Sequence, residues 1–462
     1  MAMNKPAPEI KTIADVRQAA IDAHQKGDYS KAQELYRVYL QNRPKDAAIW
    51  SNLGAVFRKL KYYQLAVAAQ LRALELDAET PSLINNAANA FYDDGQLKNS
   101  LEMRKKIIVL EPDNPDHYAS LGKCYRGLHD LGKANNILLE GIQKFPNYAE
   151  IHIQLAFVQL AMGNYPKGFE TFNWRWQGDE ISLPDLPCPK WNGETLSGKT
   201  ILVTPEQGFG DTVLMARFLR GLKQLGPQIN MVVKPPLRRL FESLEEDVTF
   251  INKKEDIQKC DYWVPMMDLP LYLKTTLNTV PPPVTLHVPE KARTRALKIT
   301  QPYSDRFKVG VMWSGSVTYR ANHKRSFNHQ RFLTFCDIPD IQMFSLYKGP
   351  LLDDFITDGT SALIVNASGN DSDFADSAAL MQELDLIISM DSAIVHVAGS
   401  LDCEVWNLLH FEPYWLYEPF KDHTPWYPSM RLISQKAPGD WDGLFEQLKF
   451  DLTERVKQWK KS

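Results

Sequence analysis

The chain has 462 residues, more than one compact hydrophobic core usually holds, and this predicts two or three domains. Its 44% hydrophobic and 24% charged residues are ordinary for a soluble globular protein, and its net charge of -3 provides no basic field for nucleic acid. No apolar run approaches the roughly 20 residues that span a bilayer, and the N-terminus lacks a signal peptide's apolar core. We therefore expect a cytoplasmic protein without a transmembrane segment. The cysteines are scattered without metal-ligand spacing, so we expect them to be reduced and buried: Cys124, Cys188, Cys260, Cys336 and Cys403.

A period of 34 residues runs through the first third of the chain. Small residues recur at this spacing, and so does a column of three prolines and one alanine: Ala32, Ala66, Ser100 and Ala134; Pro44, Ala78, Pro112 and Pro146. With Trp50, Leu53 and Gly54 in the second unit, the pattern resembles tetratricopeptide (TPR) repeats, which are helix pairs stacked into a solenoid with a concave groove. We expect repeats over 13–148 and a partial fifth repeat to about Phe172, which gives an all-α TPR solenoid over 1–172.

Residues 173–198 differ in composition, because prolines, tryptophans and turn formers crowd together there. This stretch is either a linker or a packed connecting segment, and its tryptophans are expected to join the solenoid to the following part.

From Lys199 onward, strands alternate with helices. The strand candidates fall into two sets on either side of the proline-rich stretch 280–284: first 200–204, 229–233, 248–251 and 262–264; then 309–313, 342–346, 362–365, 386–390 and 405–409. Alternation of this kind predicts parallel sheets covered by helices on both faces, with ligands at the carboxyl ends of the strands. We expect two Rossmann-like domains, at 199–290 and 300–462, the second with a closing C-terminal helix.

Three loops that follow strands carry residues able to do chemistry. The first is a glycine loop with Gln207, Gly208 and Gly210, followed by Asp211 at the start of a helix. An aspartate there is either a helix cap or a functional acid, and spacing alone favours the cap. The second loop holds Ser314 and Gly315 and then clustered cations, which suit either a diphosphate or an exposed basic surface. The third runs through Asp391, Ser392 and His396. The helix N-terminus there either binds an anion or is simply capped by Asp391, with a buried histidine behind it.

Taken in order, these stretches resemble glycosyltransferase family 9, the lipopolysaccharide heptosyltransferases. The matching segments are EQGFGDTVLMARFL, VGVMWSGS, HKRSF, FSLYKGP, DFADSAALMQELDLIISMDSAIVHVAGSL and TPWYPSMRL. The resemblance implies the two-lobed GT-B fold and transfer of a sugar from a nucleotide-sugar donor without a bound metal or another cofactor. It makes Asp211 the general base. It also places the donor against Ser314, Gly315, Lys324, Arg325, Lys348, Gly349, Asp391, Ser392 and His396.

The acceptor is less clearly specified. Ala393 stands where the family usually has a glycine, and the fusion to TPR repeats resembles O-linked protein glycosyltransferases, including bacterial flagellin-modifying ones. The leading hypothesis is therefore an inverting transferase acting on serine or threonine of a protein held in the TPR groove. Asn52 and Asn86 belong to an uncharged polar column, which either binds a peptide backbone or is polar only because the concave face is solvated. The alternatives are a transferase for envelope or lipid-linked glycans whose repeats recruit partners, and an inactive TPR scaffold.

Overall fold

The computed structural model describes residues 12–179, 181–206, 208–251, 257, 259–319 and 321–460. The contacts divide the chain into two compact units, Met1–Val158 and Gln159–Ser462. The division falls inside helix α9 (Ala149–Ala161), within the partial fifth repeat that the sequence predicts. In the described residues, no helix combines the length and the apolar character needed to cross a membrane.

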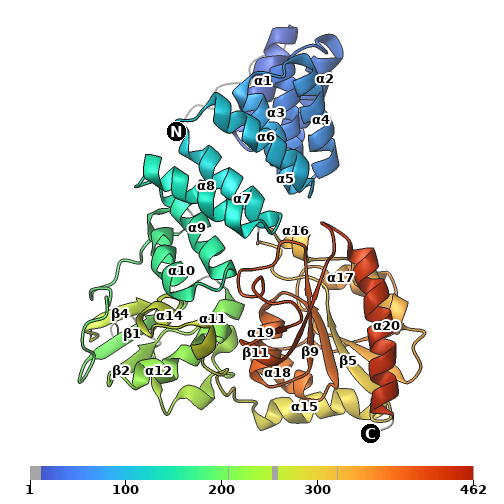
Figure 1. Ribbon diagram of the computed structural model, residues 1–462. Helices are drawn as coiled ribbons and strands as arrows, with labels where there is room; N and C mark the ends of the chain where they lie inside the picture. Colours follow the sequence, from blue (N-terminus) through green and yellow to red (C-terminus); the bar gives the residue numbers. More distant parts are fainter. Residues whose placement is uncertain are drawn as a thin grey trace, which may run out of the picture. The chain divides into compact units, whose positions relative to one another are not determined.

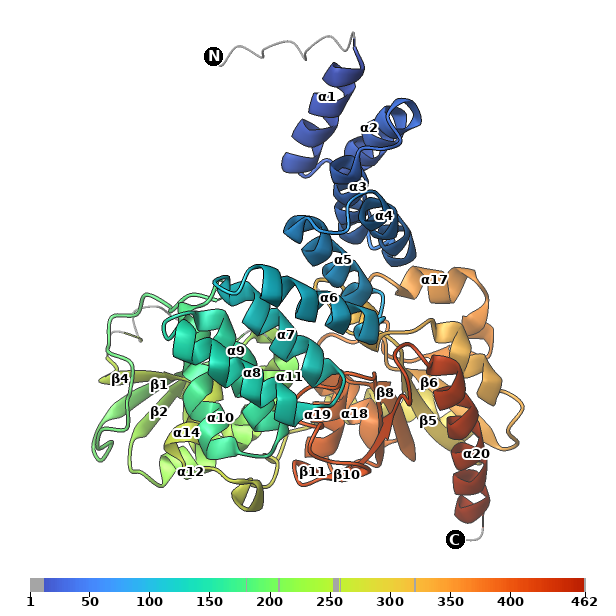
Figure 2. The ribbon, with the colours of Figure 1, turned by 45° about the horizontal axis from the view of Figure 1, so that its top comes forward.

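The first unit is a TPR-like solenoid of helix pairs (Figures 1 and 2). The first helices of successive pairs begin 34 residues apart, at Ile13, Ala47, Pro81, Pro115 and Ala149, so the predicted period is confirmed. The helices of this unit are α1 (Ile13–Gln25), α2 (Tyr29–Asn42), α3 (Ala47–Lys59), α4 (Tyr63–Leu76), α5 (Pro81–Asp93), α6 (Leu97–Leu110), α7 (Pro115–Gly127), α8 (Leu131–Lys144) and most of α9.

Small residues let the paired helices approach closely. The side chains of the column formed by Ala32, Ala66, Ser100 and Ala134 have no exposed surface. A Cβ atom on Gly122 would lie 2.5 Å from Cγ of Leu138 on the partner helix, so this contact also depends on a missing side chain. The turns within the pairs contain a residue in the left-handed conformation, again at the 34-residue spacing: Gly27, Lys61, Gly95 and His129.

The second unit begins with the end of α9, helix α10 (Tyr165–Phe172) and the 3₁₀ turn η1 (Asn173–Gln177). Its first sheet is parallel, with the strands in the order β3-β2-β1-β4. These strands are β1 (Thr200–Thr204), β2 (Gln228–Met231), β3 (Val248–Phe250) and β4 (Tyr262–Pro265). The helices among them are α11 (Phe209–Met215), α12 (Leu219–Lys223) and α14 (Leu269–Tyr272), with η2 (Ala216–Phe218), η3 (Pro235–Leu237), η4 (Glu242–Leu244), η5 (Met266–Asp268) and η6 (Leu277–Thr279).

The second sheet has the order β10-β11-β9-β8-β5-β6-β7 and is parallel except for the short edge strand β10. Its strands are β5 (Phe307–Met312), β6 (Ile341–Ser345), β7 (Ile364–Asn366), β8 (Leu386–Met390), β9 (Val405–Leu409), β10 (His423–Thr424) and β11 (Tyr427–Ser434). After β5 the chain adds β6 and β7 on one side of this strand, and it then returns to add β8 and β9 on the other side. The strand order therefore reverses between β5 and β8, and such sheets bind ligands at this point.

Helices flank the second sheet (Figure 1). Helix α15 packs on α18 and α18 on α19, whereas α20 packs against the 3₁₀ segment η8. The elements are α15 (Glu290–Thr300), α16 (Asn322–Arg325), α17 (Leu352–Thr357), α18 (Phe374–Gln382), α19 (Ala393–Ser400) and α20 (Trp441–Trp459), with η7 (Gln301–Tyr303), η8 (His329–Phe335) and η9 (Thr360–Ala362).

Several sequence predictions need correction. The helix expected after the glycine loop is broken into α11, η2 and α12, and the strand pair β10–β11 was not predicted. The strand predicted at 362–365 begins at Ile364, because residues before it form a 3₁₀ turn. The expectation of buried cysteines is wrong for two of the five, since Cys336 is exposed and Cys403 is partly exposed.

Parts of the segment 173–198 pack against the first sheet, whereas 182–185 and 192–195 are exposed. Trp191 donates its backbone N–H to the carbonyl oxygen of Trp263 in β4 at 2.8 Å, and its ring lies 4.6 Å from that of Tyr272. Lys190 forms an isolated parallel bridge with Trp263. The stretch therefore extends the edge of the first sheet beyond β4, and its tryptophans bury aromatic surface there.

Candidate functional site

The loop after β1 presents Asp211 at the start of α11. The cap position of this helix is occupied by Gly208, so the interpretation of Asp211 as the N-cap is wrong: Asp211 is the third residue of the helix. A Cβ on Gly208 would lie 2.4 Å from the Asp211 Oδ2 atom, so a side chain there would displace the carboxyl of Asp211 from its present position. Burial raises the pKa of the Asp211 carboxyl, opposed by Arg325, the backbone N–H of Gly208 and Lys234.

The loop after β5 is fixed by a small polar network. Ser314 is buried, and its Oγ atom accepts from Nδ2 of Asn322 at 3.0 Å and from Oγ of Ser326 at 3.3 Å. A Cβ on Gly315 would lie 2.9 Å from an Arg325 guanidinium nitrogen, so the glycine leaves room for that side chain. The network thus places the Arg325 cation beside the carboxyl end of β5.

The loop after β8 presents Asp391 and Ser392 to the same region. Ser392 caps α19, because its Oγ accepts the backbone N–H of Ile394 at 3.3 Å, so the alternative of Asp391 as the cap is wrong. Asp391 immediately precedes this cap and is only 8% exposed. Burial raises the pKa of Asp391 to about 6, and the negative charge of Asp211 adds to this shift. Arg325 and a hydrogen bond with Tyr417 oppose it.

His396, in the second turn of α19, contacts the glycine loop of the first sheet. Its Nδ1 atom lies 3.1 Å from the Tyr427 hydroxyl. A Cβ on Gly210 would lie 2.7 Å from its Cδ2 atom and 3.3 Å from Cα of Ala393. Burial lowers the pKa of His396 to about 3, helped by Arg217 and Arg325, so the ring is neutral near pH 7.

Arg325 connects these three loops. Its Nη1 atom lies 3.9 Å from the Asp391 Oδ2 atom, its guanidinium stacks on Tyr319 at 4.6 Å, and its charge acts on Asp211. The structure therefore brings together one cation, two carboxyls with raised pKa values and the N-terminus of α19, all at the carboxyl ends of central strands.

The remaining donor-binding predictions have other partners. Lys324 Nζ lies 2.8 Å from Oε1 of Glu412, and both side chains are largely buried. Lys348 is exposed and donates to the backbone oxygen of Asp371, while Gly349 borders the Tyr347 hydroxyl. Gln207 lies outside the described residues.

Arg217 is a part of this region that the sequence did not single out. It is 3% exposed and donates to the backbone oxygens of Pro281 and Trp426, at 3.1 and 2.7 Å. Its guanidinium lies over the rings of Trp426 and Tyr427, at 5.1 and 4.7 Å. Arg217 and Tyr427 both lie in the quoted segments EQGFGDTVLMARFL and TPWYPSMRL, but nothing in the two segments signals that they meet.

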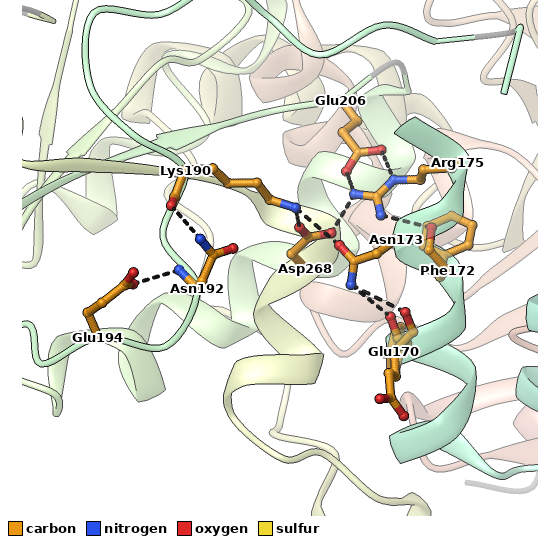
Figure 3. Close-up of polar contacts among 10 residues, drawn as sticks. Glu170, Phe172, Asn173, Arg175, Lys190, Asn192, Glu194, Glu206 and Asp268 are labelled. Carbon is orange, nitrogen blue, oxygen red and sulfur yellow. Dashed lines mark hydrogen bonds and ion pairs between the residues drawn. The ribbon is translucent and has the colours of Figure 1, made fainter. Parts of the chain in front are cut away.

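A second missed group surrounds Glu206, the residue that begins the glycine loop (Figure 3). The Arg175 guanidinium holds both Glu206 oxygens, at 2.7 and 3.3 Å, and one oxygen of Asp268 at 2.5 Å. Lys190 Nζ lies 2.6 Å from the other Asp268 oxygen. Arg175 lies in the run NWRW. The composition of this run indicates only a connecting segment, so the sequence gives no sign that Arg175 binds Glu206.

In the solenoid, Asn52 and Asn86 are half-buried on α3 and α5. Asn86 donates to Oγ of Ser51 at 3.0 Å, and Asn52 bonds to the Tyr36 hydroxyl. Each amide therefore has a partner within the solenoid, and it has further donor or acceptor capacity for a bound peptide.

No protein-family model matches the chain. It is similar to protein FlbA of Caulobacter vibrioides, with 24% identity over 443 residues, covering 89% of this chain and 73% of FlbA. That coverage is more than either compact unit contains, so the similarity extends over parts of both. Among solved structures, a MamA double mutant matches with a TM-score of 0.34 and 18% identity, over 36% of this chain and 93% of that one. PilF of Pseudomonas aeruginosa matches with a TM-score of 0.33 and 17% identity, over 37% and 78%.

Proposed function

We propose that the second unit is a nucleotide-sugar-dependent glycosyltransferase of the GT-B type. The observation that carries the proposal is the meeting of the loops after β1, β5 and β8 around Arg325. A base candidate, a cation and a helix N-terminus stand together there. Inverting sugar transfer uses a base to deprotonate the acceptor, and a cation or helix N–H groups can stabilise the charge on the leaving diphosphate. The resemblance to glycosyltransferase family 9 adds the reaction class to this geometry.

In the proposed step, a carboxylate oxygen of Asp211 takes the proton from the acceptor hydroxyl. The acceptor oxygen forms a bond to the anomeric carbon while the bond from that carbon to the diphosphate oxygen breaks. The diphosphate leaves with the electron pair. Arg325 and the backbone N–H groups at the start of α19 stabilise its charge, and breaking the Lys324–Glu412 pair would add a second cation.

The acceptor that we favour is serine or threonine of a protein segment held by the solenoid. Stacked helix pairs form extended concave binding surfaces, and amides such as Asn52 and Asn86 can bond to any peptide backbone. A transferase for envelope or lipid-linked glycans, with a solenoid that recruits partners, has the same chemistry and a different acceptor. An inactive scaffold would bind no nucleotide sugar.

The test compares Asp211→Asn with Asp15→Asn in the full chain. Both aspartates are the third residue of a helix, and an asparagine oxygen can still accept a backbone N–H at either place. We expect Asp211→Asn to keep nucleotide-sugar binding and to lower transfer by about 10²–10⁴-fold, the usual contribution of a general base. Asp15→Asn is expected to transfer at the wild-type rate.

The assay offers a panel of UDP-, GDP- and ADP-sugars together with cell extract. It measures nucleoside diphosphate release, mass shifts of glycosylated proteins, and binding by calorimetry, each with and without a chelator. Wild-type transfer by Asp211→Asn would refute the assigned base, and absence of binding across the panel would favour the scaffold. Strict dependence on a divalent ion would contradict the metal-independent mechanism.

A further inference from the structure

The polar cluster around Arg175 lies at the carboxyl ends of two neighbouring strands (Figure 3). Glu206 follows β1 and Asp268 ends the turn after β4, and β1 and β4 are paired in the first sheet. Arg175 comes from η1, outside this sheet, and contacts both carboxylates at once. This one guanidinium therefore connects the loop that leads to Asp211 with the next strand of the sheet.

The Arg175 side chain is held on all sides. It is 5% exposed, its Nη1 atom donates to the backbone oxygen of Phe172 at 3.2 Å, and it lies 4.5 Å from the ring centres of both Phe172 and Trp176. Two parallel bonds to one carboxylate fix direction as well as distance, which an ammonium group could not do. Lys190 balances the second carboxylate, Asp268, which is 1% exposed.

We propose that Arg175 is a positioning residue for the transfer reaction, and that it clamps Glu206 so that the loop ending in Asp211 is held in its reactive geometry. The inference rests on the proposed function, since it assigns Arg175 a role toward the proposed base. The proposal also gives η1, which follows the last helix of the partial fifth repeat, a role in the catalytic unit.

The cluster also shapes the charge next to Asp211. Burial raises the pKa of Glu206, Arg175 opposes the shift, and the charges of Asp268 and Asp211 add to it. Arg325, the backbone N–H of Gly208 and Lys234 lower the pKa of Asp211, and its charge also interacts with the titratable side chains of Asp391, Tyr414 and Tyr427. Because electrostatic coupling is mutual, removing the Glu206 charge should lower the pKa of Asp211 and shift the acidic limb of the kcat/KM profile to lower pH.

The test uses full-chain Arg175→Lys, with Arg455→Lys as its matched control. Arg455 also binds a glutamate through two nitrogens, Glu404 at 2.9 and 3.1 Å, and lies over the Phe307 ring. Glu404, however, precedes β9 and so lies at the amino end of a central strand of the second sheet. Hydrogen exchange of the peptide 206–215 is measured without any substrate. Transfer kinetics use whichever nucleotide sugar of the UDP-, GDP- and ADP-sugar panel the wild-type protein accepts.

We expect Arg175→Lys to accelerate exchange of 206–215 and to lower kcat by about 10- to 100-fold at unchanged donor KM, since small misplacements of reacting groups have effects of this size. Arg455→Lys should change neither. If Arg175→Lys does not fold, Glu206→Gln serves instead, because it also weakens the clamp. We then expect faster exchange of 206–215, and the acidic limb of kcat/KM at lower pH.

A wild-type exchange rate of 206–215 and a wild-type kcat in Arg175→Lys, or a wild-type exchange rate in Glu206→Gln, would overturn the positioning role while Asp211→Asn remained inactive. A wild-type rate in Asp211→Asn would instead refute the proposed function, and the exchange measurement would still decide whether Arg175 holds the loop.

Discussion

The solenoid and the two-sheet unit are stabilised by contacts of different reach. In the solenoid, polar side-chain contacts join adjacent repeats: Arg58 bonds to Asp93 and Asn86 to Ser51, each 35 residues away. In the second unit, Arg175 and Asp268 are 93 residues apart, and Arg217 reaches a backbone oxygen 209 residues away. Repeats contact mainly their neighbours, whereas a parallel sheet brings distant loops to one edge.

The ion pairs cited from the two regions differ in how deeply they are buried. Ion pairs of the solenoid such as Lys105–Glu102 and Lys133–Asp130 lie one turn apart on exposed helix faces and contribute little. The second unit buries Asp391, Arg175 and Asp268 almost completely. Burial of charged groups is costly unless they are paired, and perturbed groups of this kind gather at functional sites. Four predictions test this contrast, from the largest expected effect to the smallest.

Gly210→Ala should nearly abolish function in the two-sheet unit. The added Cβ would lie 2.7 Å from the His396 ring and 3.3 Å from Cα of Ala393, and His396 cannot move away easily because it packs on Tyr427. We expect transfer to fall by about 100-fold through displacement of Asp211. The solenoid control is Gly132→Ala, whose Cβ meets nothing within 4 Å on α8 and which should raise stability by up to about 1 kcal/mol. Equal rates in the two variants would show that the Gly210 contact is not needed.

Asp391→Asn should stabilise the protein more as the pH rises. The Asp391 pKa is raised to about 6 in the folded protein from 3.8, so wild-type stability is lost progressively as the pH rises from about 4 through 6. The asparagine removes this loss. The shift from 3.8 to about 6 corresponds to roughly 3 kcal/mol, because one pKa unit is equivalent to about 1.4 kcal/mol. Thermal unfolding at pH 4, 6 and 8 measures it. A stability difference between Asp391→Asn and the wild type that does not change with pH would contradict the assigned pKa. In a separate variant, Asp391→Ala, nucleotide-sugar binding should weaken.

Lys61→Gly and His129→Gly should stabilise the solenoid by about 1 kcal/mol each, because both residues have positive φ angles, of 64° and 60°. Gly27→Ala is the reverse control. Its φ is 78° and a Cβ there would meet nothing within 4 Å, so any loss of stability reports backbone strain alone. Urea unfolding is the measurement, and catalysis should be unaffected in all three variants. A destabilising glycine at position 61 would mean that the Lys61 side chain matters more than its backbone.

The smallest stability effect is expected for the double substitution Asn52→Ala and Asn86→Ala. Truncation of half-buried polar groups with one partner each should shift thermal unfolding only slightly. Turnover of a protein acceptor should fall, while hydrolysis of the nucleotide sugar should not. An unchanged rate on the natural acceptor would show that the groove does not hold substrate through these amides, and would favour recruitment of partner proteins.

Much of the architecture could be predicted because its signals are local. The 34-residue spacing predicted the helix pairs and their period, and strands such as Leu386–Met390 and Val405–Leu409 were predicted with their observed bounds. The caps were not: Gly208 and Ser392 take the roles that spacing assigned to Asp211 or Asp391. Cap identity depends on backbone angles of single residues, which spacing does not encode.

The sequence by itself determined the repeat, the alternation of strands and helices, and the three loops that carry candidate chemistry, since periodicity and turn residues act over a few positions. Only the tertiary structure decided that Arg325 stands between Asp211 and Asp391, that Lys324 is paired with Glu412, and that Arg175 grips Glu206. Parallel strand order places residues from distant segments at one edge of a sheet, and a single sequence contains no signal of which loops will meet there.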